Sequence, residues 1–112
     1  MAPKLKRVGF YREFGYGDAA PSVREAVRET GFYDRPAMAG YLRAAPMLAA
    51  APGVVRDVLD PDASTVMTRS LETDGVYEWP VPLAYHVAKY SLALPAEFVA
   101  HAAARGFKAP TR

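Results

Sequence analysis

A short turn, Thr73-Asp74-Gly75, is the feature that most constrains how this chain can fold. The segment before it, residues 65–71, and the segment after it, residues 76–79, are both rich in β-forming side chains. Asp-Gly between two such segments is the strongest short-range signal for a β-hairpin, because both residues tolerate the positive φ angles of a tight turn. We therefore predict a hairpin here, which excludes an all-helical fold.

Helix signals precede this hairpin. Ser22 is followed three residues later by Glu25, which is the spacing of a capping box. This pair predicts a helix over residues 22–30. Asp34 is a second N-cap candidate, and the helix that it starts is expected to end at Pro46.

Three less regular segments complete the N-terminal part of the chain. The apolar run 47–51 is too short for a typical helix, so we expect a buried strand there. Residues 54–59 alternate poorly, which favours a helical turn. Residues 1–20 are expected to form a strand near 8–14 and then a loop.

Two further helices are predicted after the hairpin. Pro80 and Pro95 mark their starts, because the first turn of a helix tolerates a residue without an N–H. The first helix is expected to end near Ser91, and the second before a loose tail at 108–112. Together these elements predict an α+β fold, in which a short antiparallel sheet or β-hairpin packs against about four helices in a single domain, 1–112.

Composition narrows the possible functions. The 112 residues include no cysteine, which excludes disulfides, thiolate metal sites and cysteine nucleophiles. The net charge is only +2 and the excess of basic residues lies at the two ends, so we expect no nucleic-acid binding. No apolar run reaches the roughly 18–20 residues of a membrane span, and no secretory signal is present, which favours a cytoplasmic protein without membrane contact.

The sequence offers no catalytic, metal or cofactor motif. Its two histidines, His86 and His101, are too few for a zinc site without further ligands at a recognisable spacing. Asp57, Asp60 and Asp62 lack the spacing of a calcium loop, and we interpret them as a solvated turn. No serine lies in a Gly-x-Ser-x-Gly elbow, and no Lys-Ser/Thr pair follows a glycine-rich loop. We therefore predict no catalytic residue, no bound metal and no cofactor.

Aromatic side chains gather around the hairpin and the helix that follows it. Tyr77 and Trp79 alternate on one strand and so share a face, and Tyr85 follows in the helix. Core packing with hydroxyl groups at the rim accounts for them. A partner-facing patch does so too, because Tyr and Trp are enriched at binding hot spots. The sequence leaves both alternatives open.

From the hairpin onward the chain resembles a known group of proteins. The shared motifs are Thr73-Asp74-Gly75, Tyr77, Trp79-Pro80, Leu83-Ala84-Tyr85 and Leu94-Pro95-Ala96-Glu97-Phe98. The group consists of small, mostly uncharacterised bacterial proteins of actinobacterial type, and some are similar to immunity proteins that neutralise polymorphic toxins. The resemblance covers residues 36–107, and it implies a shared fold without enzymatic activity. His86 stands where a second tyrosine is usual in the group.

Our leading hypothesis is a non-catalytic protein-binding protein, with an immunity-type inhibitor of a toxin as its specific form. Asp74, Tyr77, Trp79 and Tyr85 are the candidate contact residues. The aromatic side chains would supply buried area, and the acidic residues of the hairpin would complement a cationic partner. Self-association through the same surface is the other form of this hypothesis.

The alternative is a small-molecule-binding accessory protein or a small enzyme. Its pocket would lie between the sheet and the last two helices, with His86, Tyr90 and His101 as acid–base groups. A cavity lined by His86 and Tyr90 would favour this alternative. A solid core beneath an exposed aromatic patch would favour the leading hypothesis.

Overall fold

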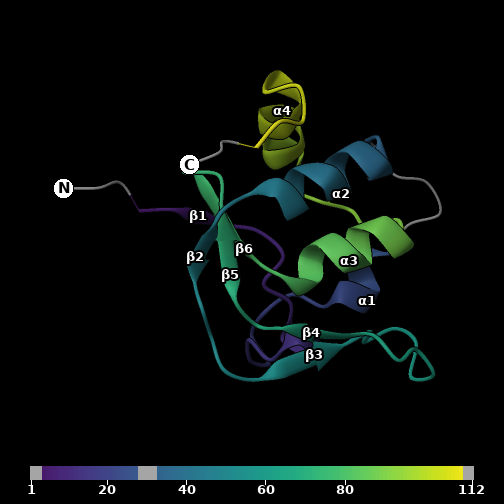
Figure 1. The fold of residues 1–112 in the computed structure, drawn as a ribbon. Coiled ribbons are helices and arrows are strands. Elements are labelled where there is room, and N and C mark those ends of the chain that lie inside the picture. The colour runs from purple at the N-terminus through teal and green to yellow at the C-terminus, as the bar shows by residue number, and fades with distance from the viewer. Residues whose placement is uncertain (1–3, 28–32, 110–112) are drawn as a thin grey trace.

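Over the part of the chain that it describes, residues 4–27 and 33–109, the computed structural model has the expected α+β fold (Figure 1). Four α-helices accompany a four-stranded mixed sheet and a two-stranded sheet in these residues. The elements are β1 (Lys6–Arg7), a 3-10 helix (Arg12–Phe14), α1 (Val23–Ala26), α2 (Arg35–Ala44), β2 (Met47–Ala49), β3 (Val54–Arg56), β4 (Val66–Thr68), β5 (Leu71–Thr73), β6 (Tyr77–Pro80), α3 (Pro82–Lys89) and α4 (Ala96–Ala104).

The predicted hairpin forms the centre of the four-stranded sheet, whose order is β1-β6-β5-β2 within the described residues. β5 and β6 pair antiparallel, with Leu71 opposite Pro80. Gly75 takes a φ of +93° in the turn between them, so the hairpin prediction is confirmed. β1 pairs with the free edge of β6 in the parallel direction, which makes the sheet mixed rather than purely antiparallel.

The N-terminal strand lies earlier than its predicted position near 8–14. Gly9 ends the extended segment, because its φ of +77° turns the chain. A Cβ at Gly9 would lie 2.6 Å from a methyl group of Leu83, so only glycine allows this close approach to α3. The chain then forms the 3-10 helix instead of continuing as a strand.

The segment 47–56 runs antiparallel to 66–73 and forms a bent two-stranded ribbon. β2 pairs with β5, and β3 pairs with β4 at the base of the view in Figure 1. The helical turn expected at 54–59 is therefore wrong, since 54–56 are held in an extended conformation by β4. The strand predicted within 47–51 is present as β2, but all three of its residues are exposed, because β2 lies at the edge of the sheet.

Helix α1 is shorter than the helix predicted over 22–30. It ends at Ala26, because Val27 adopts an extended conformation and forms a β-bridge with Leu92. The Ser22 side chain accepts a hydrogen bond from the Arg24 N–H, as an N-cap should. The remainder of the predicted helix, 28–30, lies outside the described residues.

The other helices follow their local signals closely. The Asp34 side chain caps α2 by accepting a hydrogen bond from the Ala37 N–H. Helix α3 begins at Pro82 rather than at Pro80, because Pro80 is still paired in β6. Helix α4 begins directly after Pro95, as predicted.

The core lies where α2, α3 and α4 meet the hairpin strands (Figure 1). Trp79 is completely buried, and its ring lies 5.7 Å from the ring of Phe98 and 6.1 Å from that of Tyr41. Its indole Nε1–H donates to the carbonyl oxygen of Leu42. The hairpin aromatics therefore build the core, and the exposed aromatic patch of the leading hypothesis is not present at Tyr77 and Trp79.

Candidate functional site

The residues selected from the sequence separate into two clusters, each built around a buried aspartate. Tyr85, His86 and Tyr90 gather around Asp57, in the loop after β3. Among the remaining selected residues, His101 and Tyr77 lie at Asp74 in the turn between β5 and β6, and Trp79 belongs to the core. The pocket expected from His86, Tyr90 and His101 is therefore not formed, because His101 belongs to the other cluster.

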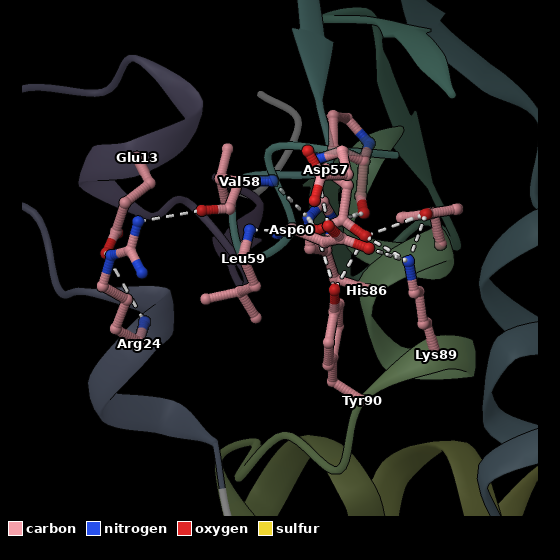
Figure 2. Close-up of polar contacts among 12 residues, drawn as sticks. Glu13, Arg24, Asp57, Val58, Leu59, Asp60, His86, Lys89 and Tyr90 are labelled. Carbon is pink, nitrogen blue, oxygen red and sulfur yellow. Dashed lines mark hydrogen bonds and ion pairs between the residues drawn. The ribbon is translucent and has the colours of Figure 1, made fainter. Parts of the chain in front are cut away.

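The Asp57 cluster joins the loop after β3 to α3 and to the residue that follows it (Figure 2). Lys89 Nζ donates to Asp57 Oδ2 at 2.8 Å. The hydroxyl groups of Tyr85 and Tyr90 donate to the same carboxylate at 2.9 Å and 2.8 Å. The N–H groups of Leu59 and Asp60 donate to Asp57 Oδ1, which closes the turn. Five donors thus occupy this one carboxylate.

Asp57 is not the solvated turn residue expected from the sequence. It is 3% exposed, and burial by itself would raise its pKa. The hydrogen bonds from Lys89, Tyr90, Leu59 and Tyr85 outweigh burial and hold the pKa of Asp57 well below its ordinary value. The same bond raises the pKa of Lys89, so the pair stays ionised at neutral pH. This arrangement binds α3 to the loop and leaves the carboxylate no open position for a metal or a substrate.

His86 lies beside this cluster but is not available for acid–base chemistry. Its side chain is completely buried, its Nδ1–H donates to the carbonyl oxygen of Pro82 at 2.8 Å, and its Nε2 accepts from the Val58 N–H at 3.3 Å. Burial lowers the pKa of His86, so the ring is neutral, and its Nε2 lies 3.8 Å from Asp57 Oδ1 without a hydrogen bond. Because both ring nitrogens are used inside the protein, His86 acts as a connector between α3 and the loop.

A second set of contacts extends this loop to α1. Figure 2 shows Arg24 between the Val58 carbonyl oxygen, to which its Nη2 donates at 3.0 Å, and the Glu13 carboxylate, 3.9 Å from its Nε. Glu13 in turn accepts from the Ser22 hydroxyl and from the Val23 N–H. The Ser22 hydroxyl therefore pairs with Glu13 of the 3-10 helix, instead of completing the predicted capping box.

The Asp74 cluster holds the tip of the hairpin against two helices. The Tyr41 hydroxyl of α2 donates to Asp74 Oδ2, and His101 Nε2 of α4 lies 2.9 Å from the same oxygen. The N–H groups of Val76 and Tyr77 donate to Asp74 Oδ1. Burial opposes ionisation, but these hydrogen bonds outweigh it and lower the pKa of Asp74. Asp74 therefore remains a carboxylate that is fully used within the fold.

Arg105 completes this second cluster. Its Nη1 donates to the Asp74 carbonyl oxygen at 3.0 Å and lies 3.9 Å from Asp74 Oδ2. Asp74 and Tyr77 are 3% and 4% exposed, so they cannot meet a partner in this conformation, and the expected charge complementarity to a cationic partner does not come from Asp74. Tyr85 is the one contact candidate that keeps partial exposure.

Neither cluster has the geometry of a reaction centre. An acid–base or metal site needs a donor or acceptor that remains open to the reacting molecule, and here the two carboxylates are saturated by the protein's own groups. Within residues 4–27 and 33–109, no group of three or more His, Asp and Glu side chains could hold a metal ion. Each cluster therefore joins elements that are distant in sequence.

Four of the six exposed large apolar side chains in the described residues lie elsewhere, on the ribbon. We use the term ribbon surface for Met47, Leu48, Val54, Arg56 and Val66. Its four apolar members are between 44% and 62% exposed. Val54, Arg56 and Val66 share one face of the β3–β4 pair, since Arg56 lies opposite Val66 and two residues from Val54. Sequence reasoning missed this surface, because an apolar run gives no sign of whether its strand lies at an edge.

No helix in the described part of the chain is long and apolar enough to cross a membrane. Comparison with known protein families, with curated proteins and with solved structures gives no match. The fold and the surfaces of this chain are therefore the basis for its proposed function.

Proposed function

We propose that this chain is a non-catalytic protein-binding domain and that its partner binds along the ribbon surface. The observation that carries this proposal is the exposure of Met47, Leu48 and Val54, at 54%, 44% and 62%. Exposed large apolar side chains along an unpaired strand edge are uncommon on a domain without a partner, because such an edge promotes association.

The form of the surface favours an extended partner segment. β2 is the outer strand of its sheet, and β3 is paired only with β4 among the described residues, so both strands offer backbone N–H and C=O groups along one edge. A segment in extended conformation can add to such an edge by main-chain hydrogen bonds. Specificity then comes from every second side chain of the bound segment, because these side chains face the ribbon surface.

The charge of the surface indicates what that segment carries. Residues 47–55 contain no charged side chain, and Arg56 follows them on β3 with no ion pair to the described residues. Val54 and Val66 flank Arg56 on the same face. A segment in which an acidic residue alternates with apolar residues would satisfy both features.

More specifically, we propose that the chain is an immunity-type inhibitor that binds a toxin. The resemblance of residues 36–107 to bacterial proteins that include relatives of immunity proteins motivates it. Such a protein acts by steric occlusion, which requires a binding surface and no catalytic group. The saturation of Asp57 and Asp74 by internal hydrogen bonds is consistent with a role of this kind.

Site-specific photo-crosslinking in the native cell tests the proposal. A photoreactive phenylalanine is placed at Leu48 or Val54, and in a matched control at Val76, which is 37% exposed but lies on the hairpin turn away from the ribbon. We expect one discrete adduct from positions 48 and 54 and none from 76, identified by mass spectrometry.

Two further variants decide whether the ribbon surface is responsible. Leu48→Lys and Arg56→Glu change exposed side chains and are expected to preserve the fold, as checked by circular dichroism, while abolishing the adduct from position 54. Equal adducts from positions 54 and 76, or an adduct that survives both substitutions, would contradict the proposal. An adduct to the chain itself, with a dimer of the purified protein by light scattering, would replace it with self-association.

A further inference from the structure

A cavity of about 510 Å³ lies on a part of the molecule that neither cluster nor the ribbon surface uses. It is formed where the segment 7–11 meets the start of α1 and the connection between α3 and α4. Cavities of roughly 300–1,000 Å³ with mostly apolar walls and a few polar groups are typical of small-molecule sites. None of its lining residues belongs to β2, β3 or β4, so this site is independent of the proposed protein-binding function.

The walls of this cavity are predominantly apolar. Phe10 supplies an aromatic face, and Pro21 and Pro95 contribute proline rings from the two opposing segments. Ala26 and Ala93 lie between them and are joined by a hydrogen bond from the Ala93 N–H to the Ala26 carbonyl oxygen. Alanine and proline side chains have almost no rotamer freedom to lose, so a flat apolar group that binds against them pays little side-chain entropy.

A positively charged side chain, that of Arg7, lies at this cavity. Arg7 is exposed, and its guanidinium lies 3.8 Å from the centre of the Phe10 ring. No acidic side chain of the described residues forms an ion pair with Arg7. A guanidinium that is held by stacking on an aromatic ring and keeps its N–H groups open is well suited to bind a carboxylate.

A tyrosine, Tyr11, also contributes to the wall of the cavity. Tyr11 is 6% exposed and lines the cavity, and its hydroxyl forms no hydrogen bond with the described residues. Burial raises its pKa to about 12, so the hydroxyl stays protonated at neutral pH and can donate. The hydroxyl is not among the buried polar atoms of the described residues that lack a hydrogen bond, so it is accessible to water.

Glu25 limits the charge that the cavity accepts. It lines the same cavity, and its carboxylate lies 3.7 Å from Arg12. A ligand with one carboxylate can meet Arg7 while its body faces the apolar walls. A second carboxylate would bring like charge near Glu25, which disfavours dicarboxylates.

We propose that this cavity binds a small organic monocarboxylate with a flat apolar body, in which the carboxylate pairs with Arg7 and the body lies against Phe10, Pro21 and Pro95.

Binding of 2-naphthoate to the full chain tests this inference, with 2-naphthamide as the neutral isostere and 2,6-naphthalenedicarboxylate as the dianion. Titrations followed by backbone amide NMR are expected to show shifts at Gly9, Phe10, Ala26 and Ala93 for the monocarboxylate. We expect the amide, which loses the charge-assisted contact with Arg7, to bind at least about tenfold more weakly. We expect the dicarboxylate, whose second carboxylate brings like charge near Glu25, to bind more weakly as well.

Two variants separate this site from adventitious binding. Arg7→Gln is expected to weaken 2-naphthoate binding by about tenfold or more, whereas Arg56→Gln, which removes an exposed arginine outside the cavity, leaves it unchanged. The unfolding midpoint of each variant shows that the fold is intact. Equal affinity for the acid and the amide, unchanged affinity in Arg7→Gln, or no binding of 2-naphthoate at millimolar concentration would overturn the inference.

Discussion

Asp57 and Asp74 form the same kind of contact in two regions of the molecule, but their hydrogen-bond donors differ in access to water. Each carboxylate has a side-chain exposure of 0% and accepts two backbone N–H groups, together with two tyrosine hydroxyls at Asp57 and one at Asp74. At Asp57 the other donors lie near the surface: Tyr85 and Tyr90 are half-buried, and the Lys89 side chain is 38% exposed. At Asp74 the main side-chain donor, Tyr41, is completely buried.

The number of hydrogen bonds therefore does not by itself determine how much a buried carboxylate contributes to the free energy of unfolding. When such a group is removed, each former donor either finds water or is left without a partner, and the second outcome carries the larger cost. Lys89, Tyr85 and Tyr90 can turn toward solvent. Tyr41 cannot, because it is packed beneath α4 and its ring lies 6.4 Å from that of Phe98.

Replacement of the two aspartates by alanine tests this comparison directly and has the largest expected effect. We expect Asp74→Ala to lower the free energy of unfolding by about 3–5 kcal/mol, as for the loss of one partner of a buried charged cluster. Asp57→Ala is expected to cost less, about 2–3 kcal/mol, because its donors become hydrated. Urea unfolding at pH 7 measures both.

Asp62→Ala provides the control for this pair, since Asp62 is an exposed aspartate in the loop after Asp57. Its substitution should change stability by no more than about 0.5 kcal/mol. If Asp57→Ala were as costly as Asp74→Ala, access of the donors to water would not explain the difference between the clusters.

Glu72 offers a third carboxyl group that sharpens the comparison, because it is half-buried without a cationic partner within 4 Å among the described residues. Burial raises the pKa of Glu72 to about 7. The native state therefore keeps this proton at pH values where the unfolded chain, with an ordinary value of 4.5, has released it. Stability must then fall as the pH rises from about 4.5 to about 7.

Glu72→Gln removes this penalty. We expect the variant to match the wild-type protein near pH 4 and to be more stable at pH 8 by about 1–2 kcal/mol, after allowance for solvent screening. Urea unfolding across this pH range provides the measurement, and Glu97→Gln, at an exposed position in the first turn of α4, controls for the loss of one charge. A variant that gains nothing between pH 4 and pH 8 would show that Glu72 is hydrated in the native state.

Features that depend on residues close together in the sequence could be predicted, whereas contacts between residues distant in sequence could not. The hairpin turn at Gly75 and the cap of α2 at Asp34 depend on residues within a few positions of each other, and both were predicted. The partners of Asp57 lie about 30 residues away, from Tyr85 to Tyr90, and no local pattern pairs them. The sequence therefore indicated only a turn at Asp57, although its buried side chain also binds α3 and the residue after it.

The same reasoning explains why the strand at 47–51 was wrongly expected to be buried and why the sequence left the burial of Tyr77 and Trp79 open. The apolar run that begins at Met47 and the aromatic pair Tyr77 and Trp79 have similar hydrophobic character in the sequence. Their exposure is opposite because β6 lies inside the sheet and β2 lies at its edge. Strand order depends on the pairing of β1 with β6, between segments about 70 residues apart, so neither outcome could be obtained from local patterns.

The smallest expected effect concerns single hydroxyl groups in the two clusters. Tyr41→Phe removes a donor that is completely buried, and its loss leaves the buried Asp74 carboxylate with fewer hydrogen bonds, so we expect a cost of about 1–2 kcal/mol. Tyr90→Phe removes one of five donors at Asp57, where water can take its place, and should cost about 0.5 kcal/mol or less.

Combining each substitution with its aspartate variant isolates the pairwise contribution. The coupling between Tyr41 and Asp74 should exceed that between Tyr90 and Asp57 by about 1 kcal/mol in double-mutant cycles. Equal coupling would mean that the Tyr41 hydroxyl finds another acceptor when Asp74 is absent, and Arg105 would then be the group that rearranges, since its Nη1 lies 3.5 Å from that hydroxyl. The cycle therefore tests whether the contribution of Tyr41 to stability depends on its hydroxyl having no alternative partner.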